Sequence, residues 1–414
     1  MAALHRYQQT RGIRGVWRIE GYDRGGFDGC VVIPALAESE RLFATLHSLA
    51  LNPAPLLERF LVVVVVNHRE DAAAEQKEDN RHTLQRLRDG FPPLNLALVD
   101  AAGDGLELPA KTGGVGLARK IGMDLALSRL TENAIIACLD ADTTVEQSYL
   151  PAILTHFADH SAAGGAVLPF RHQKGESLRE ERAITLYELF LRHYVLGLTF
   201  AGSPYAFHTV GSAMACTVPS YIKMGGMNSR SAAEDFYFLQ HLQKTAGVSR
   251  LRGSTVHPAA RSSHRVPFGT GKSVSQIVHH GEGWQTFYSV DCFLILKEWL
   301  HLVQEQTGLS GRELLCCSRR ISRHLTAHLE ELHFEEVWER LSRNAHDTNS
   351  LLRAFHCWFD GLKTVRLVHR LCHRFPRQAA AQAVPDLLAV AGFPAVGDEE
   401  AQLDLLRDLQ NGTD

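Results

Sequence analysis

The chain has 414 residues, of which 45% are hydrophobic and 21% charged, and it carries a formal net charge of -3 with a pI near 6.7. These proportions describe a folded protein, and the near-neutral charge provides no electrostatic footprint for nucleic acid. Because single cores stop growing at about 250–300 residues, we expect one large domain with an appendage, or two domains.

Four apolar, β-branched runs in the first third of the chain predict buried strands. They lie at residues 29–34, 60–66, 94–99 and 134–139. Helical patterns separate them, at residues 42–49, after residue 71 and from about 116 to 130. Strands that alternate with helices in this way form β-α-β units, so we expect an α/β fold with a doubly wound, mostly parallel sheet.

Beyond residue 142 the pattern becomes irregular and then wholly helical. We expect helices near 147–158, 178–198 and 234–244 and a strand near 212–217. From about residue 275 amphipathic helices follow at 284–307, 311–333, 335–343 and 350–374, and the acidic last 20 residues are expected to fray. The expected organisation is an N-terminal segment (1–28), an α/β domain (29–274) and a helical C-terminal region (275–414).

The cysteines and the N-terminus indicate a reducing compartment. The eight cysteines are scattered without a CxxC pair, and the N-terminus lacks the apolar region of a signal peptide. Residues 194–218 are long and apolar enough to span a bilayer, but they contain glycines and a proline that favour a helix, a loop and then a buried strand. We therefore expect a cytoplasmic protein, with peripheral contact at the cytoplasmic face of a membrane as an open alternative.

Polar residues follow each of the four predicted strands. In an open parallel sheet ligands bind beyond the carboxyl ends of the strands, so these residues mark the expected site. They are Pro34 to Glu38 after the first strand, Asn67 after the second, Lys111 to Arg119 after the third and Asp140 to Asp142 after the fourth.

Asp140 and Asp142 are separated by one residue at a strand end. Two such carboxylates can share a hard cation, since oxygen ligands suit Mg²⁺ or Mn²⁺, and the cation would in turn bridge a diphosphate. The alternative is a turn in which the aspartates cap backbone amides.

Four motifs in order, over roughly residues 29–270, resemble those of a family 2 glycosyltransferase of the GT-A fold, of the inverting, non-processive type. They are VVIPALAESE, GGVGLARKIGMDLAL, CLDADT and GGMNSRSAAEDFYFLQHL. The resemblance implies that Asp140 and Asp142 are the metal and donor-ribose carboxylates and that Asp235 is the general base. Inverting sugar transfer does need a carboxylate to take the acceptor's proton. The alternative for Glu234 and Asp235 is that they cap the helix that begins there.

The chain departs from the family pattern in several places. Asn67 stands where a carboxylate usually reads the donor base, and its amide could still hydrogen-bond a base. Lys120 replaces the usual asparagine and is expected to be a solvated helix residue, with a contribution to phosphate binding as the alternative. The QxxRW signature is missing; a loop with Arg265 stands there instead, and an arginine beside Pro and Gly residues suits a flap over a diphosphate. An ordinary surface loop is the alternative.

The predicted function is sugar transfer from a UDP- or GDP-sugar to an acceptor hydroxyl, with Mg²⁺ or Mn²⁺. GT-A enzymes often add a late histidine to the metal, and His257 or His264 could serve. The predicted donor-binding residues are Pro34, Glu38, Asn67, Lys111, Arg119, Asp140 and Arg265, and the predicted metal ligands are Asp142, Asp140 and His257. The acceptor, lipid-linked or soluble, is not identified. A sugar-phosphate nucleotidyltransferase and a non-catalytic nucleotide-sugar-binding scaffold are the alternatives.

Overall fold

The computed structural model describes residues 2–262, 269–394 and 396–412. The chain forms two compact units. The sheet unit consists mainly of residues up to 181 and of residues 209–275, and the helical unit of residues 182–208 and 276–410. Residues 2–28 belong to the sheet unit, and residues 182–208 belong to the helical unit.

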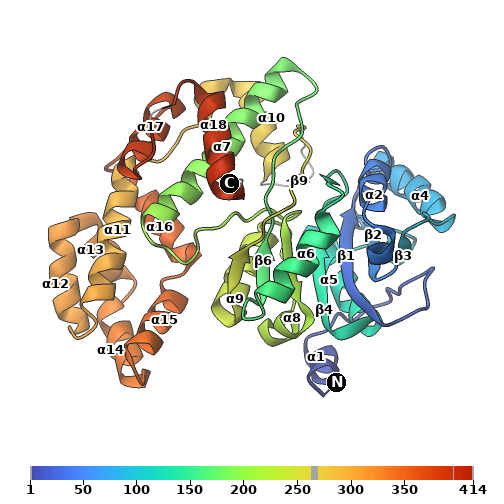
Figure 1. Ribbon diagram of the computed structural model, residues 1–414, viewed down its shortest axis with the longest axis horizontal. Coiled ribbons are helices and arrows are strands. Elements are labelled where there is room, and N and C mark those ends of the chain that lie inside the picture. Colours follow the sequence, from blue (N-terminus) through green and yellow to red (C-terminus); the bar gives the residue numbers. More distant parts are fainter. Residues whose placement is uncertain (1, 263–268, 395, 413–414) are drawn as a thin grey trace. The chain divides into compact units, whose positions relative to one another are not determined.

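A seven-stranded sheet forms the core of the sheet unit, in the order β3-β2-β1-β4-β7-β6-β8. Figure 1 labels β1 to β4 and β6 of this sheet. Its strands are β1 (Phe27–Ala35), β2 (Phe60–Asn67), β3 (Asn95–Ala101), β4 (Leu130–Cys138), β6 (Gly165–Val167), β7 (Met214–Thr217) and β8 (Val248–Arg250). β7 pairs antiparallel with β4 and with β6, whereas the other neighbours pair parallel. The α/β fold with a mostly parallel sheet, expected from the sequence, is therefore confirmed.

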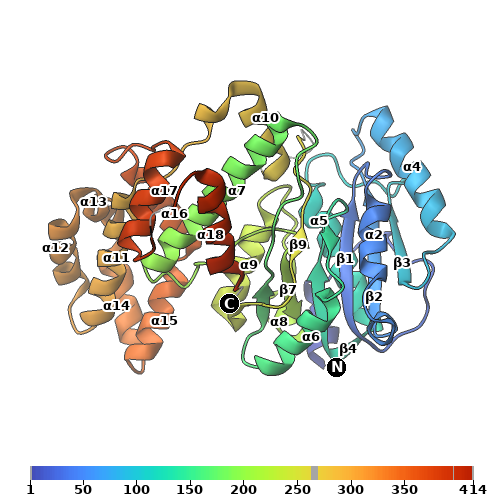
Figure 2. The same cartoon turned by 45° about the horizontal axis from the view of Figure 1, so that its top comes forward.

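Helices surround this sheet (Figure 2). They are α1 (Ala2–Thr10), α2 (Leu42–Ala50), α3 (Ala54–Leu57), α4 (Ala74–Arg88), α5 (Val115–Ala126), α6 (Tyr149–Asp159), α8 (Val218–Met224) and α9 (Glu234–Ala246). A Cβ on Gly122 of α5 would lie 2.5 Å from Val32 and 2.8 Å from Val65. The glycine therefore lets α5 pack directly on β1 and β2, which places the first half of α5 at the carboxyl ends of these strands.

A second, two-stranded sheet pairs β5 (Thr144–Val145) antiparallel with β9 (Val256–His257). Thr144 lies opposite His257 in this pairing. Because β5 begins two residues after Asp142, the small sheet brings the segment after β9 close to the end of β4.

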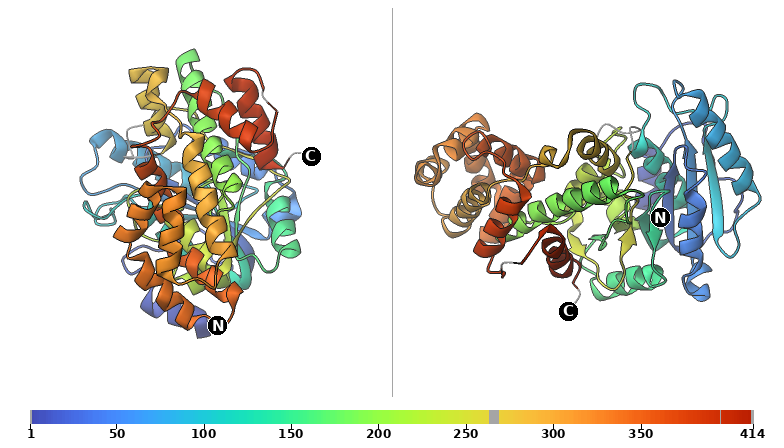
Figure 3. Two further views of the ribbon diagram at one scale, coloured as in Figure 1. Left: turned by 90° about the vertical axis from the view of Figure 1, so that its left-hand side faces the viewer. Right: turned by 90° about the horizontal axis from the view of Figure 1, so that it is seen from above.

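The helical unit contains most of α7 (Leu178–Phe200) and the C-terminal helices (Figure 3). These are α11 (Val290–Glu305), α12 (Gly311–Ile321), α13 (Arg323–Glu331), α14 (Phe334–Asn344), α15 (Thr348–Trp358), α16 (Gly361–Leu371), α17 (Ala380–Val390) and α18 (Glu399–Asn411). The preceding helix, α10 (Thr270–His280), is divided between the two units after residue 275. Trp299 of α11 is fully buried, and Phe334, Phe355 and Phe359 pack around its ring. Such aromatic clusters contribute much of the buried apolar area in a small core.

Several predicted helices differ in their ends. The expected helix 311–333 is divided into two helices, α12 and α13. Ser322 leaves the helical conformation between them, and its side chain accepts hydrogen bonds from His324 N and Leu325 N. The expected helix 350–374 also breaks, where the Asp360 side chain caps α16 by accepting from Lys363 N. Such caps satisfy amides that lack an intrahelical partner.

The expectation that the last 20 residues fray was wrong for residues 399–411, which form a helix. They contain α18, whose Leu403 and Leu406 are buried, and α17, just before them, was not predicted. The expected helix-loop-strand order of residues 194–218 is confirmed by the end of α7 and by β7. Among the described residues, we find no helix with the length and apolar content needed to cross a membrane.

Candidate active site

Acidic side chains gather beyond the carboxyl end of β4. The segment that follows this strand alternates, so that Leu139 and Ala141 are buried while Asp140 and Asp142 stay partly accessible. The side chains of these aspartates are 36% and 23% exposed, respectively. Each aspartate contacts a different arginine, and the two arginines define two neighbouring clusters.

The first cluster is formed around Arg119 of α5, whose side chain is only 2% exposed. Its Nη2 donates to Asp140 Oδ1 at 2.6 Å, and its Nε donates to Glu234 Oε1 at 3.2 Å. Burial opposes the charge on Arg119, but Asp140 and Glu234 outweigh burial and raise its pKa above the ordinary value. A buried arginine with two carboxylate partners stays charged and fixes their positions.

Close packing of α5 against the loop before α9 brings this cluster together. A Cβ on Gly116 would lie 2.3 Å from Arg230 O and 2.9 Å from Glu234 Cβ. Only a residue without a side chain permits this approach. The glycines of the GGVG segment therefore serve packing in this structure.

Asp235 lies in the first turn of α9, next to Glu234. The cap position before them is Ala233, which has a left-handed conformation (φ 55°) and makes no side-chain capping bond. Asp235 Oδ1 accepts only from the adjacent Phe236 N, at 2.7 Å, among its contacts with described residues. Neither residue occupies the cap position, but Asp235 satisfies one amide of the first turn, so the capping alternative stays open beside the proposed catalytic role.

Burial and the charge of Glu234 raise the pKa of Asp235 to about 7, although Phe236 N and Arg119 act in the opposite direction. Desolvation disfavours the ionised form of a carboxyl group, and a neighbouring carboxylate adds to the effect. A carboxyl group that titrates near neutral pH in a partly accessible position is suited to proton transfer.

Gly211 leaves room beside Asp235 and Arg119. A Cβ at this position would lie 2.3 Å from Arg119 Nη2 and 3.7 Å from Asp235 Oδ2. A side chain at this position would overlap the guanidinium group of Arg119. The glycine, in the loop before β7, therefore allows Arg119 to take its position.

The second cluster is formed around Arg261, which the sequence analysis missed. Arg261 donates to Asp142 Oδ2 from Nη2 at 2.9 Å and from Nε at 3.2 Å, and it also forms an ion pair with Glu38. Asp142, Glu38 and Arg261 come from the ends of β4, β1 and β9. Arg261 lies four residues after His257 but outside every motif, so only its place after a strand end could have drawn attention to it.

The three predicted metal ligands do not fit a divalent ion as they stand. Asp140 is paired with Arg119, and Asp142 with Arg261. The side chain of His257 contacts Arg171 O through Nδ1 at 3.2 Å and Glu146 through Nε2 at 3.6 Å. Within the described ranges no three His, Cys, Asp or Glu side chains are grouped so that they could hold a metal ion.

The other predicted donor-binding residues are more scattered. Pro34 is buried within β1, and the Asn67 amide is buried and donates to Ala35 O and Val65 O at 3.1 Å each. In this structure the amide nitrogen of Asn67 is therefore hydrogen-bonded to backbone carbonyl groups of β1 and β2. Lys111 is exposed on a turn before α5. Arg265 and His264 lie outside the described residues.

Lys120, expected to be solvated, is partly buried and pairs with Asp124 at 2.8 Å. The hydroxyl groups of Tyr7 and Tyr221 both donate to Asp124 Oδ1 at 2.7 Å. This network connects α1 with α5 and α8. Because the side chain of Lys120 is only 14% exposed, the expectation that it is solvated was wrong.

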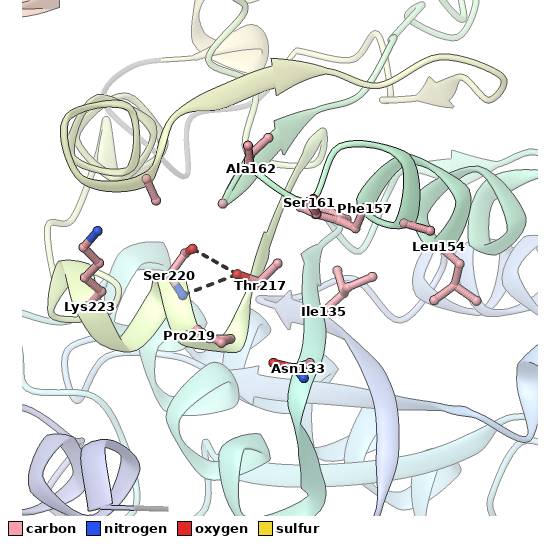
Figure 4. A pocket seen from close by; sticks show the side chains of 14 residues that line it. Asn133, Ile135, Leu154, Phe157, Ser161, Ala162, Thr217, Pro219, Ser220 and Lys223 are labelled. Carbon is pink, nitrogen blue, oxygen red and sulfur yellow. Dashed lines mark hydrogen bonds between the residues drawn. The ribbon is translucent and has the colours of Figure 1, made fainter. Parts of the chain in front are cut away.

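A cavity of about 560 Å³ opens near the amino end of β4, away from both clusters (Figure 4). Asn133 and Ile135 of β4 line it together with Thr217, Ser220 and Lys223. Thr217 accepts a hydrogen bond from Ser220 N and caps α8. The lining contains no carboxylate, so the acid chemistry of the chain lies at the opposite end of the strand.

Comparison with protein families found no matching family model, and no curated protein matches the chain. Solved structures of similar fold include S. aureus TarS 1–349 in complex with UDP-GlcNAc, at 15% identity over 84% of this chain and 92% of that one, with a TM-score of 0.39. Another is the mannosyltransferase PcManGT from Pyrobaculum calidifontis in complex with GDP-Man and Mn²⁺, at 15% identity over 87% and 95% of the two chains, with a TM-score of 0.38. At this level neither likeness assigns an activity to the chain.

Proposed function

We propose that this protein is a glycosyltransferase that moves a sugar from a nucleoside-diphosphate sugar to an acceptor hydroxyl with inversion at the anomeric carbon. The observation that carries the proposal is Asp235, a carboxyl group with a pKa of about 7 beside Glu234 at the carboxyl edge of a parallel sheet. Ligands of such sheets bind at this edge. The four sequence motifs that resemble family 2 glycosyltransferases support the same activity.

Asp235 is the proposed general base. Its carboxylate takes the proton of the acceptor hydroxyl while the acceptor oxygen forms a bond to the anomeric carbon. The bond from that carbon to the diphosphate oxygen breaks, and the nucleoside diphosphate leaves with the electron pair. Because only the ionised carboxylate accepts a proton, turnover is expected to rise with pH through about 7, the pKa of Asp235.

Arg119 and Arg261 are the proposed positioning groups of the site. Arg119 keeps Asp140 and Glu234 in place beside Asp235, and Arg261 keeps Glu38 and Asp142 together. Preorganised charges of this kind need no reorganisation during the reaction. Mg²⁺ or Mn²⁺ stays a prediction from the sequence, and no step proposed here depends on it.

The test compares Asp235→Asn with the wild type. Asparagine keeps the size of the side chain but cannot accept the proton, so turnover should fall by about 10²–10⁴ while donor affinity persists. UDP-GlcNAc and GDP-Man, which the two solved neighbours bind, are the first donors to titrate by calorimetry. Turnover is then followed as release of the nucleoside diphosphate, with and without Mn²⁺.

Asp28→Asn is the matched control, since Asp28 lies in the same sheet unit at the amino end of β1 and pairs with the exposed Arg59. It should leave turnover unchanged. Turnover in Asp235→Asn within a few-fold of the wild type would show that Asp235 is not the base. Absence of nucleotide-sugar binding and turnover in the wild type would remove the proposed function itself.

A further inference from the structure

Two cysteines of the helical unit have neighbouring thiol groups. Cys292 lies in the first turn of α11, and Cys372 directly follows α16, a helix that packs against α11. Their side chains are hydrogen-bond partners of each other. Cys292 is fully buried, whereas Cys372 is partly exposed and donates to Val368 O at 3.2 Å. The fold thus brings a buried thiol and an accessible thiol together from distant parts of the sequence.

A cation lies beside this pair of thiols. Arg377 hydrogen-bonds the side chain of Cys372, and its Nη2 donates to Tyr288 Oη at 2.8 Å. Its guanidinium group lies 4.3 Å from the centroid of the Tyr288 ring, which is a cation–π distance. Tyr288 Oη also shares a hydrogen bond of 2.9 Å with His369 Nε2. These contacts keep the positive charge next to Cys372.

The two thiols differ in acidity. The hydrogen bond from Cys292 and the charge of Arg377 lower the pKa of Cys372 to about 6, although burial acts in the opposite direction. The hydrogen bond to Cys372 and burial raise the pKa of Cys292. A thiolate next to a cation in a partly exposed position is the reactive form of cysteine. Cys372 is therefore the nucleophile of the pair, and Cys292 is its protonated neighbour.

Three cysteines of the sheet unit show what distinguishes this pair. Cys30, Cys138 and Cys216 lie on the neighbouring strands β1, β4 and β7, and each is at most 1% exposed. Burial raises the pKa of each of these thiols. They are protonated and inaccessible to solvent, and buried thiols of this kind behave as small hydrophobic side chains. Nearness of thiols alone therefore does not create a reactive pair.

We propose that Cys292 and Cys372 form a redox-sensitive dithiol, which hydrogen peroxide converts into a disulfide between α11 and the end of α16. The Cys372 thiolate attacks one oxygen of the peroxide, the O–O bond breaks, and a sulfenic acid forms while hydroxide leaves. The Cys292 sulfur then attacks the sulfur of Cys372, so that the S–S bond forms and the S–O bond breaks. The departing hydroxide takes the proton of Cys292 and leaves as water. In total the two thiols lose two electrons and two protons, and the peroxide is reduced to two molecules of water.

The experiment oxidises the full chain with a small excess of hydrogen peroxide, removes the excess with catalase and counts the free thiols after denaturation. The reduced chain contains eight cysteines, and the oxidised chain should contain two fewer free thiols. A digest without reductant should contain the peptides of Cys292 and Cys372 as one cross-linked species. Its mass should be lower than that of the two separate peptides by two hydrogen atoms. Dithiothreitol should restore all eight thiols.

Variants separate this bond from other oxidation. Cys372→Ser should not lose a pair of thiols, and Cys292→Ser should stop at the sulfenic acid of Cys372, which dimedone traps. Arg377→Gln removes the cation beside Cys372 and should slow the loss of thiols several-fold. Cys316→Ser is the matched control, because Cys316 is an exposed cysteine of α12 in the same unit. It should leave the cross-link unchanged.

Eight free thiols after treatment with peroxide would overturn the proposal. A digest in which Cys372 is linked to another cysteine, or is oxidised without a link to Cys292, would overturn it as well. The digest of the wild type requires no variant, so it gives a result even if a serine variant fails to fold. No nucleotide sugar takes part in these measurements, and their outcome is independent of the proposed function.

Discussion

Arg119 in the sheet unit and Arg192 in the helical unit are both almost fully buried, yet their surroundings differ. Arg119 is paired with Asp140 and Glu234, and Asp235 lies beside this group. Arg192 is paired with Glu188 one turn earlier on α7, and Glu188 also accepts from Arg407 of α18. Asp140, Glu234 and Asp235 surround one arginine in the first group, whereas in the second group Glu188 pairs with two arginines, Arg192 and Arg407.

The difference teaches how to tell a reactive buried charge from a structural one. Around Arg119 the side chain of Asp140 is 36% exposed, and burial together with the charge of Glu234 raises the pKa of Asp235 to about 7. Around Arg192 the ion pair is inaccessible to solvent, because the side chains of Glu188 and Arg192 are 0% exposed. Burial alone does not mark a functional site; a perturbed titration in an accessible position does.

The largest expected effect tests the structural side of this comparison. Glu188→Ala leaves the guanidinium of Arg192 buried without this carboxylate, which typically costs about 3–5 kcal/mol. The free energy of unfolding from urea melts, followed by helical circular dichroism, should fall accordingly. Glu331→Ala, which removes the exposed partner of Arg370, should cost no more than about 1 kcal/mol. Equal losses of unfolding free energy in the two variants would contradict the interpretation that Glu188 and Arg192 form a buried structural pair.

Gly211→Ala tests the reactive side. The new Cβ would lie 2.3 Å from Arg119 Nη2, so the arginine and the carboxylates around it must shift. Misplacement of groups by about 1 Å can reduce turnover about 10²-fold. Steady-state turnover of the nucleotide sugar should fall by that order. Gly283→Ala is the control, since nothing lies within 4 Å of its added Cβ. Wild-type turnover in Gly211→Ala would show that this packing does not position the site.

A pH dependence of stability caused by Asp235 is expected as well. The pKa of its carboxyl group is about 7 in the folded protein, against 3.8 as the ordinary value. Between these values the folded state keeps a proton that the unfolded state has lost, so stability falls as pH rises. The melting temperature of Asp235→Asn relative to the wild type should therefore increase from pH 4 to pH 8. A constant difference would mean that the pKa of Asp235 is not raised.

Much of the sheet and part of the candidate site could be predicted from the sequence. The strands at 29–34, 60–66, 94–99 and 134–139 correspond to β1 to β4, because runs of apolar, β-branched residues specify buried strands locally. Asp140 and Asp142 were visible because they follow such a run directly, and Asp235 because it lies in a recognisable motif at the start of a helix.

Only the tertiary structure decided which charges meet. Arg261 is 119 residues from Asp142 and 223 from Glu38, so no local pattern could join them. The same holds for α18, whose acidic sequence suggested fraying, although Arg407 reaches Glu188 across 219 residues. Local propensity is a property of neighbours along the chain, whereas pairing of buried charges depends on which strand ends and helices the fold brings together. The sequence by itself thus determined the strands and the aspartates that follow them, and the packing of distant segments decided that arginines hold those aspartates.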